Sequence, residues 1–192
     1  MRSSRTPCPD QGGRSLFRLF LLVLLTFPLL SACSQVAPSV YDNETPKLVL
    51  KDFLEGRLQG RGIYQDRTGK VTHRFRIDMT ASWEGNVCTF IEDFVYSDGR
   101  KEQRRWTLTE VSPGRFTALA NDSAGPGSGE AHGNTLHWIY PLRLTTEYGE
   151  QDVTFDYWMY RLDETTMMNR FTVEKFGITL GNGSVLFEKL PG

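Results

Sequence analysis

The sequence lacks an apolar run long enough to cross a membrane as a helix. Its longest run extends from Leu19 to Leu30 and is interrupted by Thr26 and Pro28. A membrane-spanning helix needs roughly 20 apolar residues, because the hydrocarbon core is ~30 Å thick and a helix rises ~1.5 Å per residue. The run is therefore too short for a permanent span. With arginines before it and small residues after it, the run is typical of a cleavable secretory signal.

Cysteine is scarce, with three in 192 residues. Cys8 lies upstream of the apolar run and Cys33 follows it closely, so we assign both to the signal and its cleavage site. Cys88 is then the one cysteine left to the rest of the chain, which excludes an internal disulfide even in an oxidising compartment. Because Cys88 lies in a strand-like run, we interpret it as a small core residue rather than a reactive thiol.

The chain also has no excess of positive charge. It carries 22 basic and 23 acidic residues, and four of the arginines fall within residues 1–32. The remaining part is therefore acidic, and no basic patch stands out in it. This balance argues against a nucleic-acid partner and against electrostatic docking to anionic lipid.

Clustered catalytic or metal-binding residues are missing as well. The histidines His73, His132 and His137 have no useful spacing for a shared metal. Glu92 and Asp93 are adjacent, so their side chains would point to opposite faces of a strand and could not act as one acid-base pair. We therefore expect no catalytic residues, no metal and no cofactor, and we do not expect an enzyme.

The end of the apolar run carries a sharper signal. Leu30-Ser31-Ala32-Cys33 resembles the lipobox of bacterial lipoproteins. The resemblance implies that Cys33 is lipidated on sulfur and becomes the first residue after cleavage, and two or three acyl chains give stable anchoring. Ser34, rather than Asp, follows the cysteine, which favours the outer membrane, facing the periplasm. The alternative is an ordinary signal peptide with a chance cysteine.

These observations divide the chain into three segments. Residues 1–32 are the predicted signal peptide, and residues 33–46 are a polar, proline-bearing lipidated tether. Residues 47–192 are one β-barrel domain, large enough for a hydrophobic core. At its start, Leu48 to Leu54 is expected to form a short helix or a first strand.

The hydrophobic pattern of the domain repeats every two residues, as in strands, rather than every 3.6 residues, as in helices. Apolar residues alternate with polar ones from Val71 to Trp83 and again from Leu136 to Leu144, as in half-buried strands. Turn signals separate such runs, and most would close antiparallel hairpins. They are Asp66-Arg67-Thr68-Gly69, Glu84-Gly85-Asn86, Ser97-Asp98-Gly99, Pro113-Gly114, Tyr148-Gly149-Glu150 and Gly181-Asn182-Gly183.

The pattern predicts an all-β, antiparallel, up-and-down barrel of the lipocalin-like kind, because hairpins in series must close to hide their edges. The alternative is a β-sandwich. The glycine-rich stretch 121–134 lacks the Lys-Ser/Thr ending of a phosphate loop, so we expect a flexible loop or the mouth of the barrel there.

Several strand faces combine apolar residues with one or two polar groups. If these faces point inward, they would line a cavity with the general build of a small-ligand site. With Arg104 or Lys175, such a cavity could hold an amphiphile with an acidic head, for example a fatty acid or lysolipid. The alternative is that these charges pair with one another in a filled barrel or face solvent. The candidate ligand-binding residues are Phe90, Glu92, Arg104, Trp106, Asp156, Trp158, Asn169 and Lys175.

Short segments in order along residues 48–190 carry a family resemblance. They are Asp66–Thr72, Trp83–Asn86, Glu92–Gly99, Arg105-Trp106, Gly133–Trp138, Asp156–Tyr160, Asn169-Arg170 and Lys175–Gly177. The chain resembles a family of bacterial lipoproteins catalogued as domain of unknown function 3833. It departs from that pattern at residues 122–127, where Pro126 stands in place of an acidic residue.

The resemblance implies a lipoprotein with a lipocalin-like β domain and no established activity. Members are often encoded near enzymes of membrane-lipid modification, which suggests a role with envelope lipid but gives no mechanism. Our leading hypothesis is a lipid-anchored periplasmic barrel that binds a hydrophobic or amphiphilic ligand in envelope-lipid handling. The alternative is a structural or interaction lipoprotein with a filled barrel and a protein partner in the envelope, and a third is an unrecognised enzyme acting on lipids.

Overall fold

The computed structural model describes residues 36–146 and 149–191. The predicted signal peptide and Cys33 lie outside the described residues. Residues 37–192 form one compact unit. Its elements are η2 (Pro38–Tyr41), α2 (Leu50–Phe53), β1 (Gly56–Asp66), β2 (Val71–Glu84), β3 (Val87–Tyr96), β4 (Lys101–Ser112), β5 (Arg115–Ala120), β6 (Gly127–His132), β7 (Thr135–Thr146), β8 (Gly149–Arg161), β9 (Thr166–Lys175) and β10 (Ile178–Lys189).

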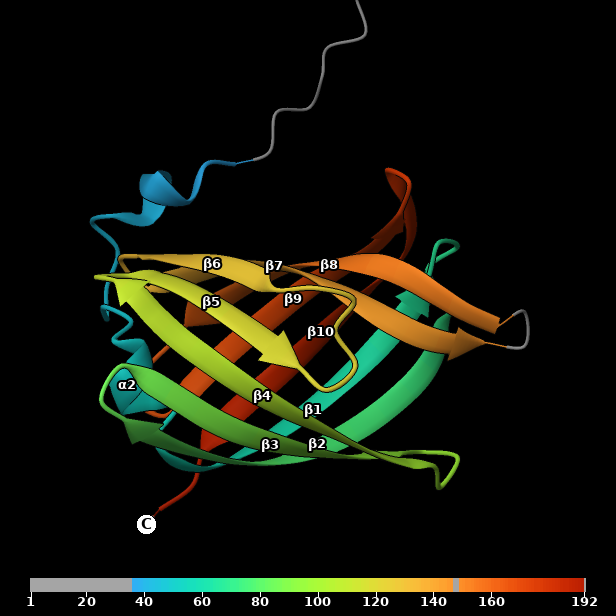
Figure 1. Cartoon of the computed structure of the whole chain (residues 1–192), viewed down its shortest axis with the longest axis horizontal. Coiled ribbons are helices and arrows are strands. Elements are labelled where there is room, and N and C mark those ends of the chain that lie inside the picture. Colours follow the sequence, from blue (N-terminus) through green and yellow to red (C-terminus); the bar gives the residue numbers. More distant parts are fainter. Residues whose placement is uncertain (1–35, 147–148, 192) are drawn as a thin grey trace, which may run out of the picture. The chain divides into compact units, whose positions relative to one another are not determined.

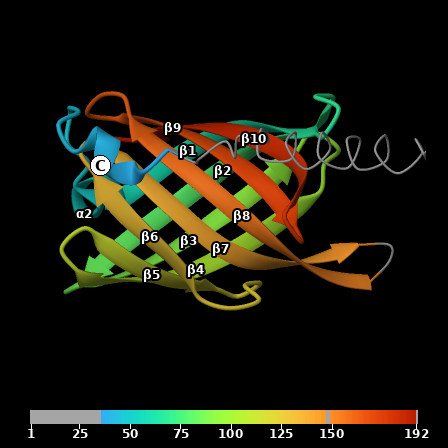
Figure 2. The same ribbon diagram turned by 90° about the horizontal axis from the view of Figure 1, so that it is seen from above.

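The strands form a closed antiparallel barrel in which each strand pairs with its neighbours in the sequence (Figure 1). The first strand also pairs with the last, with Gly60 opposite Phe187, and this pairing closes the barrel. Figure 2 shows the strands wrapping around a common axis. The up-and-down, lipocalin-like barrel predicted from the hairpin series is therefore confirmed, and the β-sandwich alternative is wrong. No helix among the described residues is long and apolar enough to cross a membrane.

The inside of the barrel follows the predicted alternation. In β2, Ile77, Met79 and Ala81 are buried while Asp78 and Thr80 are exposed. The same alternation in β7 buries Leu136, Trp138, Tyr140 and Leu142. Residues i and i+2 of a strand share a face, so one face of each strand supplies the core.

Inward-facing glycines make room for aromatic residues on neighbouring strands. A Cβ added to Gly129 would lie 2.0 Å from Cε3 of Trp138, so no side chain fits between these two strands at that point. The other pairs built in this way are Gly60 with Phe187, Gly62 with Phe75, Gly127 with Tyr140 and Gly183 with Phe171. We call these the glycine–aromatic pairs.

Two sequence predictions are wrong because of these pairs. Residues 121–134 were expected to form a flexible loop or the mouth of the barrel, but they contain strand β6, in which Gly129 lies against the Trp138 ring and Gly127 against Cβ of Tyr140. Gly181-Asn182-Gly183 was expected to be a turn, but it lies inside β10, opposite β1 and β9. In both places glycine serves close packing in a strand rather than chain reversal. The turn signals at Gly69, Gly85, Gly99 and Gly114 hold, and these glycines have positive φ values. Tyr148 of another predicted turn lies outside the described residues.

One end of the barrel is closed by α2, which lies at the left in Figure 1. Leu50 and Phe53 of this short helix are 3% and 2% exposed and belong to the core. The Lys51 ammonium donates to the carbonyl of Gly85 in the β2–β3 turn. These contacts hold α2 as a plug over the interior.

Residues 37–48, which we call the N-terminal strap, pack on the barrel. Residues 37–46 of the predicted tether belong to this strap. The Tyr41 ring lies 5.7 Å from the Tyr160 ring, and Asp42 Oδ1 lies 2.6 Å from His132 Nδ1. The Leu48 amide donates to the Gly133 carbonyl over 2.7 Å. The strap therefore ends directly in the plug.

Candidate functional site

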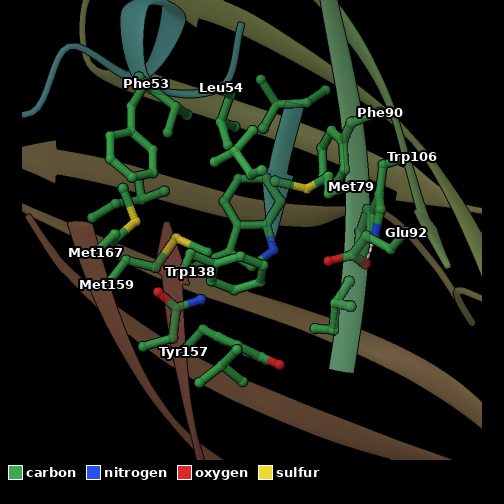
Figure 3. A pocket seen from close by; sticks show the side chains of 18 of the residues that line it. Phe53, Leu54, Met79, Phe90, Glu92, Trp106, Trp138, Tyr157, Met159 and Met167 are labelled. Carbon is green, nitrogen blue, oxygen red and sulfur yellow. Dashed lines mark hydrogen bonds between the residues drawn. The ribbon is translucent and has the colours of Figure 1, made fainter. Parts of the chain in front are cut away.

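A cavity lies inside the barrel, next to the plug (Figure 3). Its volume is about 80 Å³. One water needs roughly 10–15 Å³ on this kind of measure, so the cavity has room for several water-sized groups. The apolar residues that line it are Leu50, Phe53, Leu54, Leu58, Ile77, Met79, Phe90, Phe94, Trp106, Leu108, Leu136, Trp138, Met159, Met167, Val185 and Phe187.

Three methionines from three strands line this cavity. Met79 comes from β2, Met159 from β8 and Met167 from β9, and Figure 3 shows them on two sides of the space around Trp138. Methionine is unbranched and adopts many shapes at little cost, so walls of this kind adapt to what they contact. The lumen can therefore widen more readily than one walled by branched or aromatic residues.

Glu92 is the buried acid of the cavity. It faces inward from β3, and the Trp106 indole donates to Glu92 Oε2 over 2.9 Å, which Figure 3 marks. Burial raises the pKa of the Glu92 carboxyl above its ordinary value, against the opposing effects of the Arg104 charge and the Trp106 hydrogen bond.

Arg104 stands directly across the strand pair from Glu92 and is already engaged. Its Nε donates to both carboxylate oxygens of Asp122, over 3.0 and 2.8 Å. The Arg104 side chain is 14% exposed and the Asp122 side chain 32%. Asp122 therefore balances the charge of this guanidinium, which also lines the cavity.

Tyr140 and Tyr157 add two neutral hydroxyl groups to the lining. Their rings lie 5.6 Å apart, and the two hydroxyls share a hydrogen bond. Burial raises the pKa of both phenols. Both therefore stay uncharged at any physiological pH, and they contribute dipoles rather than charges.

Asn169 is the most deeply buried polar group of the lining. The residue is 1% exposed on β9, across the lumen from Glu92 on β3. Its Oδ1 has no hydrogen-bond partner among the residues that the structure describes. A buried acceptor without a partner destabilises a protein by about 1–3 kcal/mol, so it is typical of a site that receives a donor from outside the chain.

The candidate residues of β3, β4 and β9 meet around this cavity. Phe90, Glu92, Arg104, Trp106 and Asn169 all line it. The structure brings them together because the alternation in these strands places each of them on the inner face. Ligand binding by these residues stays a prediction.

Asp156, Trp158 and Lys175 do not line the cavity. Asp156 and Trp158 lie on the outer face of β8, where Asp156 Oδ1 is 2.8 Å from His137 Nε2 and the Trp158 ring stacks on the His137 ring at 4.1 Å. We expected the side chains of Asp156 and Trp158 to face inward, but in β8 the neighbouring residues Tyr157 and Met159 do so. Lys175 lies at the end of β9, where it donates to Gln151 beside the Phe176 ring.

Several lining residues were missed by sequence reasoning. Tyr157 and Met159 occupy the inner face of β8, and an alternative reading of that strand with the opposite parity would have found them. Asp122 does not line the cavity, and its pairing with Arg104 could not have been found because it lies in the connection between β5 and β6. No three His, Cys, Asp or Glu side chains gather as a metal site in the described part of the chain.

A second hollow lies on the outer wall over β1, β2, β3, β9 and β10. Arg61, Arg74 and Arg76 line it together with apolar residues, although no basic patch stood out in the sequence. The arginines come together because outward positions of β1 and β2 are in register. Arg61 pairs with Glu188 and Arg76 with Asp78, so much of this charge is compensated. We assign this hollow no ligand.

The barrel is similar to solved structures at low sequence identity. Rv2717c from M. tuberculosis superimposes with a TM-score of 0.56 at 13% identity, over 78% of this chain and 100% of that one. The S-type phycobiliprotein lyase CPES from Guillardia theta superimposes with a TM-score of 0.53 at 6% identity, over 72% of this chain and 89% of that one. At these identities the similarity shows a shared lipocalin-like fold and nothing of activity.

Sequence comparison adds one match. The family model described as a protein of unknown function, DUF3833, matches residues 27–189. No curated protein matches the chain.

Proposed function

The chain belongs to the DUF3833 family, and on that premise we propose that its barrel binds a hydrophobic or amphiphilic small molecule. The observation that carries this proposal is the lumen of the barrel, whose lining is mostly apolar and has a few polar groups at defined places. Ligand sites in proteins have this composition, because apolar walls supply affinity and the polar groups fix orientation.

The volume of the lumen limits the ligand. Sites for drug-sized molecules have volumes of roughly 300–1,000 Å³, well above the 80 Å³ present here. We propose that a single slender chain or a small ring enters, and that Met79, Met159 and Met167 move to accommodate it. A bulky multi-chain lipid would require the barrel itself to open.

We further propose that the protein is anchored through lipid on Cys33 and acts in the handling of envelope lipid at the outer membrane, facing the periplasm. This part is supported by the lipobox resemblance and by the apolar run before it. Metabolic labelling with an alkyne analogue of palmitate tests it: we expect label in the wild type and in Cys88→Ala, and none in Cys33→Ala. Label retained in Cys33→Ala would contradict the anchor.

The binding proposal is tested on residues 34–192, which include the whole compact unit, by native mass spectrometry after incubation with envelope lipid extract. We expect a one-to-one adduct. Met167→Trp should abolish the adduct, because Met167 lines the lumen. Met168→Trp, the same change at the next residue of β9 where the side chain points outward, should leave it unchanged.

Circular dichroism would establish that both variants fold, and Met79→Phe is a second way to fill the lumen if Met167→Trp does not fold. A folded wild-type protein that never holds a lipid would overturn the binding proposal.

That outcome would favour the second candidate, an interaction protein with a filled barrel. One observation favours it: the β9–β10 hairpin exposes apolar side chains, with Phe176 93% and Ile178 61% exposed. Exposed apolar groups of this kind are common where proteins meet partners. Crosslinking in cells from position 176 would then identify the partner.

A further inference from the structure

The polar groups of the lumen define the head of the ligand. We propose that the bound molecule has a head group that donates hydrogen bonds, an ammonium or a hydroxyl, and that Asn169 Oδ1 and the Glu92 carboxyl accept them. This inference rests on the proposed binding function and makes it specific.

Asn169 is the first reason. Its Oδ1 is a buried acceptor that lacks a donor among the described residues, and the residue lines the lumen. A carbonyl oxygen has two lone pairs and no hydrogen to give. A donor on the ligand would satisfy it, whereas a carboxylate or phosphate head would place further acceptors against it.

The charges around the lumen are the second reason. Arg104 and Asp122 pair with each other, so their charges cancel. Glu92 is the carboxylic acid of the lining, and Trp106 donates a hydrogen bond to it. An anionic head would add a second negative charge in a desolvated space, whereas an ammonium would balance Glu92 and a hydroxyl would leave the charge unchanged.

This inference differs from the acidic head expected from the sequence. That expectation relied on Arg104 or Lys175 being available for an anion. Arg104 is held by Asp122, and Lys175 lies at the end of β9 beside Gln151 and Phe176. The charge of Arg104 is thus already balanced by Asp122, and Lys175 is not part of the lumen lining.

The walls around these acceptors define the other end of the ligand. Phe53 and Leu54 of the plug region, together with Met159 and Met167, enclose apolar space around the lumen (Figure 3). An alkyl tail fits such a lining. The ligand class is therefore a single-chain amphiphile with an amine or alcohol head.

The test compares ten-carbon probes that share a tail: decylamine, decanol, decanoic acid and decane. Isothermal titration calorimetry on residues 34–192 at neutral pH gives the dissociation constants. We expect decylamine or decanol to bind at least about tenfold more tightly than decanoic acid and decane, because a donor to a buried acceptor replaces an unmade hydrogen bond. The amine and alcohol arms distinguish a charged donor from a neutral one.

Two variants assign the preference to its residues. Asn169→Leu should bring all four probes to within about threefold of one another while tail binding persists. Asn182→Leu, the same change at an exposed position of β10, should keep the wild-type preference. Glu92→Gln should weaken decylamine more than decanol, and it also provides the test if Asn169→Leu does not fold.

The outcomes separate this inference from the proposed function. If no probe binds, the binding function itself fails. If all four bind equally to the wild type, or if decanoic acid binds best, the lumen is a binding site but the donor head is wrong. Preference for the amine or alcohol that Asn169→Leu abolishes supports the inference.

Discussion

Asn169 should lower the stability of the empty protein while it favours ligand binding. Its unpaired Oδ1 destabilises the empty protein, so we expect Asn169→Leu to raise the free energy of unfolding by about 1–3 kcal/mol. Urea unfolding followed by circular dichroism measures this change. Asn182→Leu on the exposed side of β10 should change stability little. A loss of stability in Asn169→Leu would show that the amide makes a stabilising contact in the empty lumen.

Glu92 gives the barrel a pH dependence of defined sign. Burial raises its folded pKa above the ordinary value of 4.5, so between these two values the folded state holds a proton that the unfolded state releases. The unfolding free energy should therefore fall as pH rises through that window. We expect Glu92→Gln to remove this part of the slope, measured as urea midpoints from pH 4 to 8. Equal slopes in both proteins would show that Glu92 titrates normally.

The positions of individual side chains were predictable where the two faces of a strand differ in polarity. In β4 the outer face is mostly polar, so the inward position of Trp106 followed from alternation. In β8 both faces carry aromatic residues, and period two alone could not choose between Tyr157 and Trp158. An aromatic residue occurs at position 158 on the outer face because Tyr41 of the N-terminal strap packs against it.

At the scale of elements, the N-terminal strap depends on one glycine. Gly133 has a φ of 54°, and an added Cβ would lie 1.7 Å from the Tyr41 carbonyl oxygen. Gly133→Ala should therefore release the strap. Hydrogen exchange of the Leu48 amide, which donates to the Gly133 carbonyl, is the direct measurement.

Gly85→Ala is the matched control for the strap. Gly85 has a similar φ of 63°, but nothing lies within 4 Å of an added Cβ. The variant Gly85→Ala introduces the same kind of backbone strain as Gly133→Ala, but its added Cβ does not collide with Tyr41. Protection of Leu48 should be lost in Gly133→Ala and kept in Gly85→Ala. Loss in both variants would trace the effect to general destabilisation.

Elements were predictable from the sequence where glycine and asparagine mark turns at hairpin ends, as at Gly69 and Gly99. They were not predictable where glycine makes space. Gly129 and Gly183 belong to strands because of rings on neighbouring strands. That requirement comes from residues distant in the sequence, so no local pattern reveals it.

At the scale of the whole molecule, the β1–β10 pairing decides whether the barrel closes. Phe187 faces inward from β10, is 6% exposed and lies against Gly60. We expect Phe187→Ala to lower the free energy of unfolding by about 3–5 kcal/mol, as for a buried aromatic residue. Leu186→Ala, on the outer face of the same strand, should have a clearly smaller effect in the same urea titration. Equal losses of stability would mean that outer-face residues of β10 stabilise the β1–β10 pairing as much as Phe187 does.

The glycine–aromatic pairs have a consequence for how such barrels diverge. Each pair divides one volume between two strands, so a larger residue at one position is tolerated only with a smaller one at the other. Gly129→Ala and Trp138→Leu should each be harmful alone and less harmful together, which is positive epistasis. Related barrels should therefore show these positions covarying, and the contour of the lumen should drift in paired steps while its polar residues stay in place.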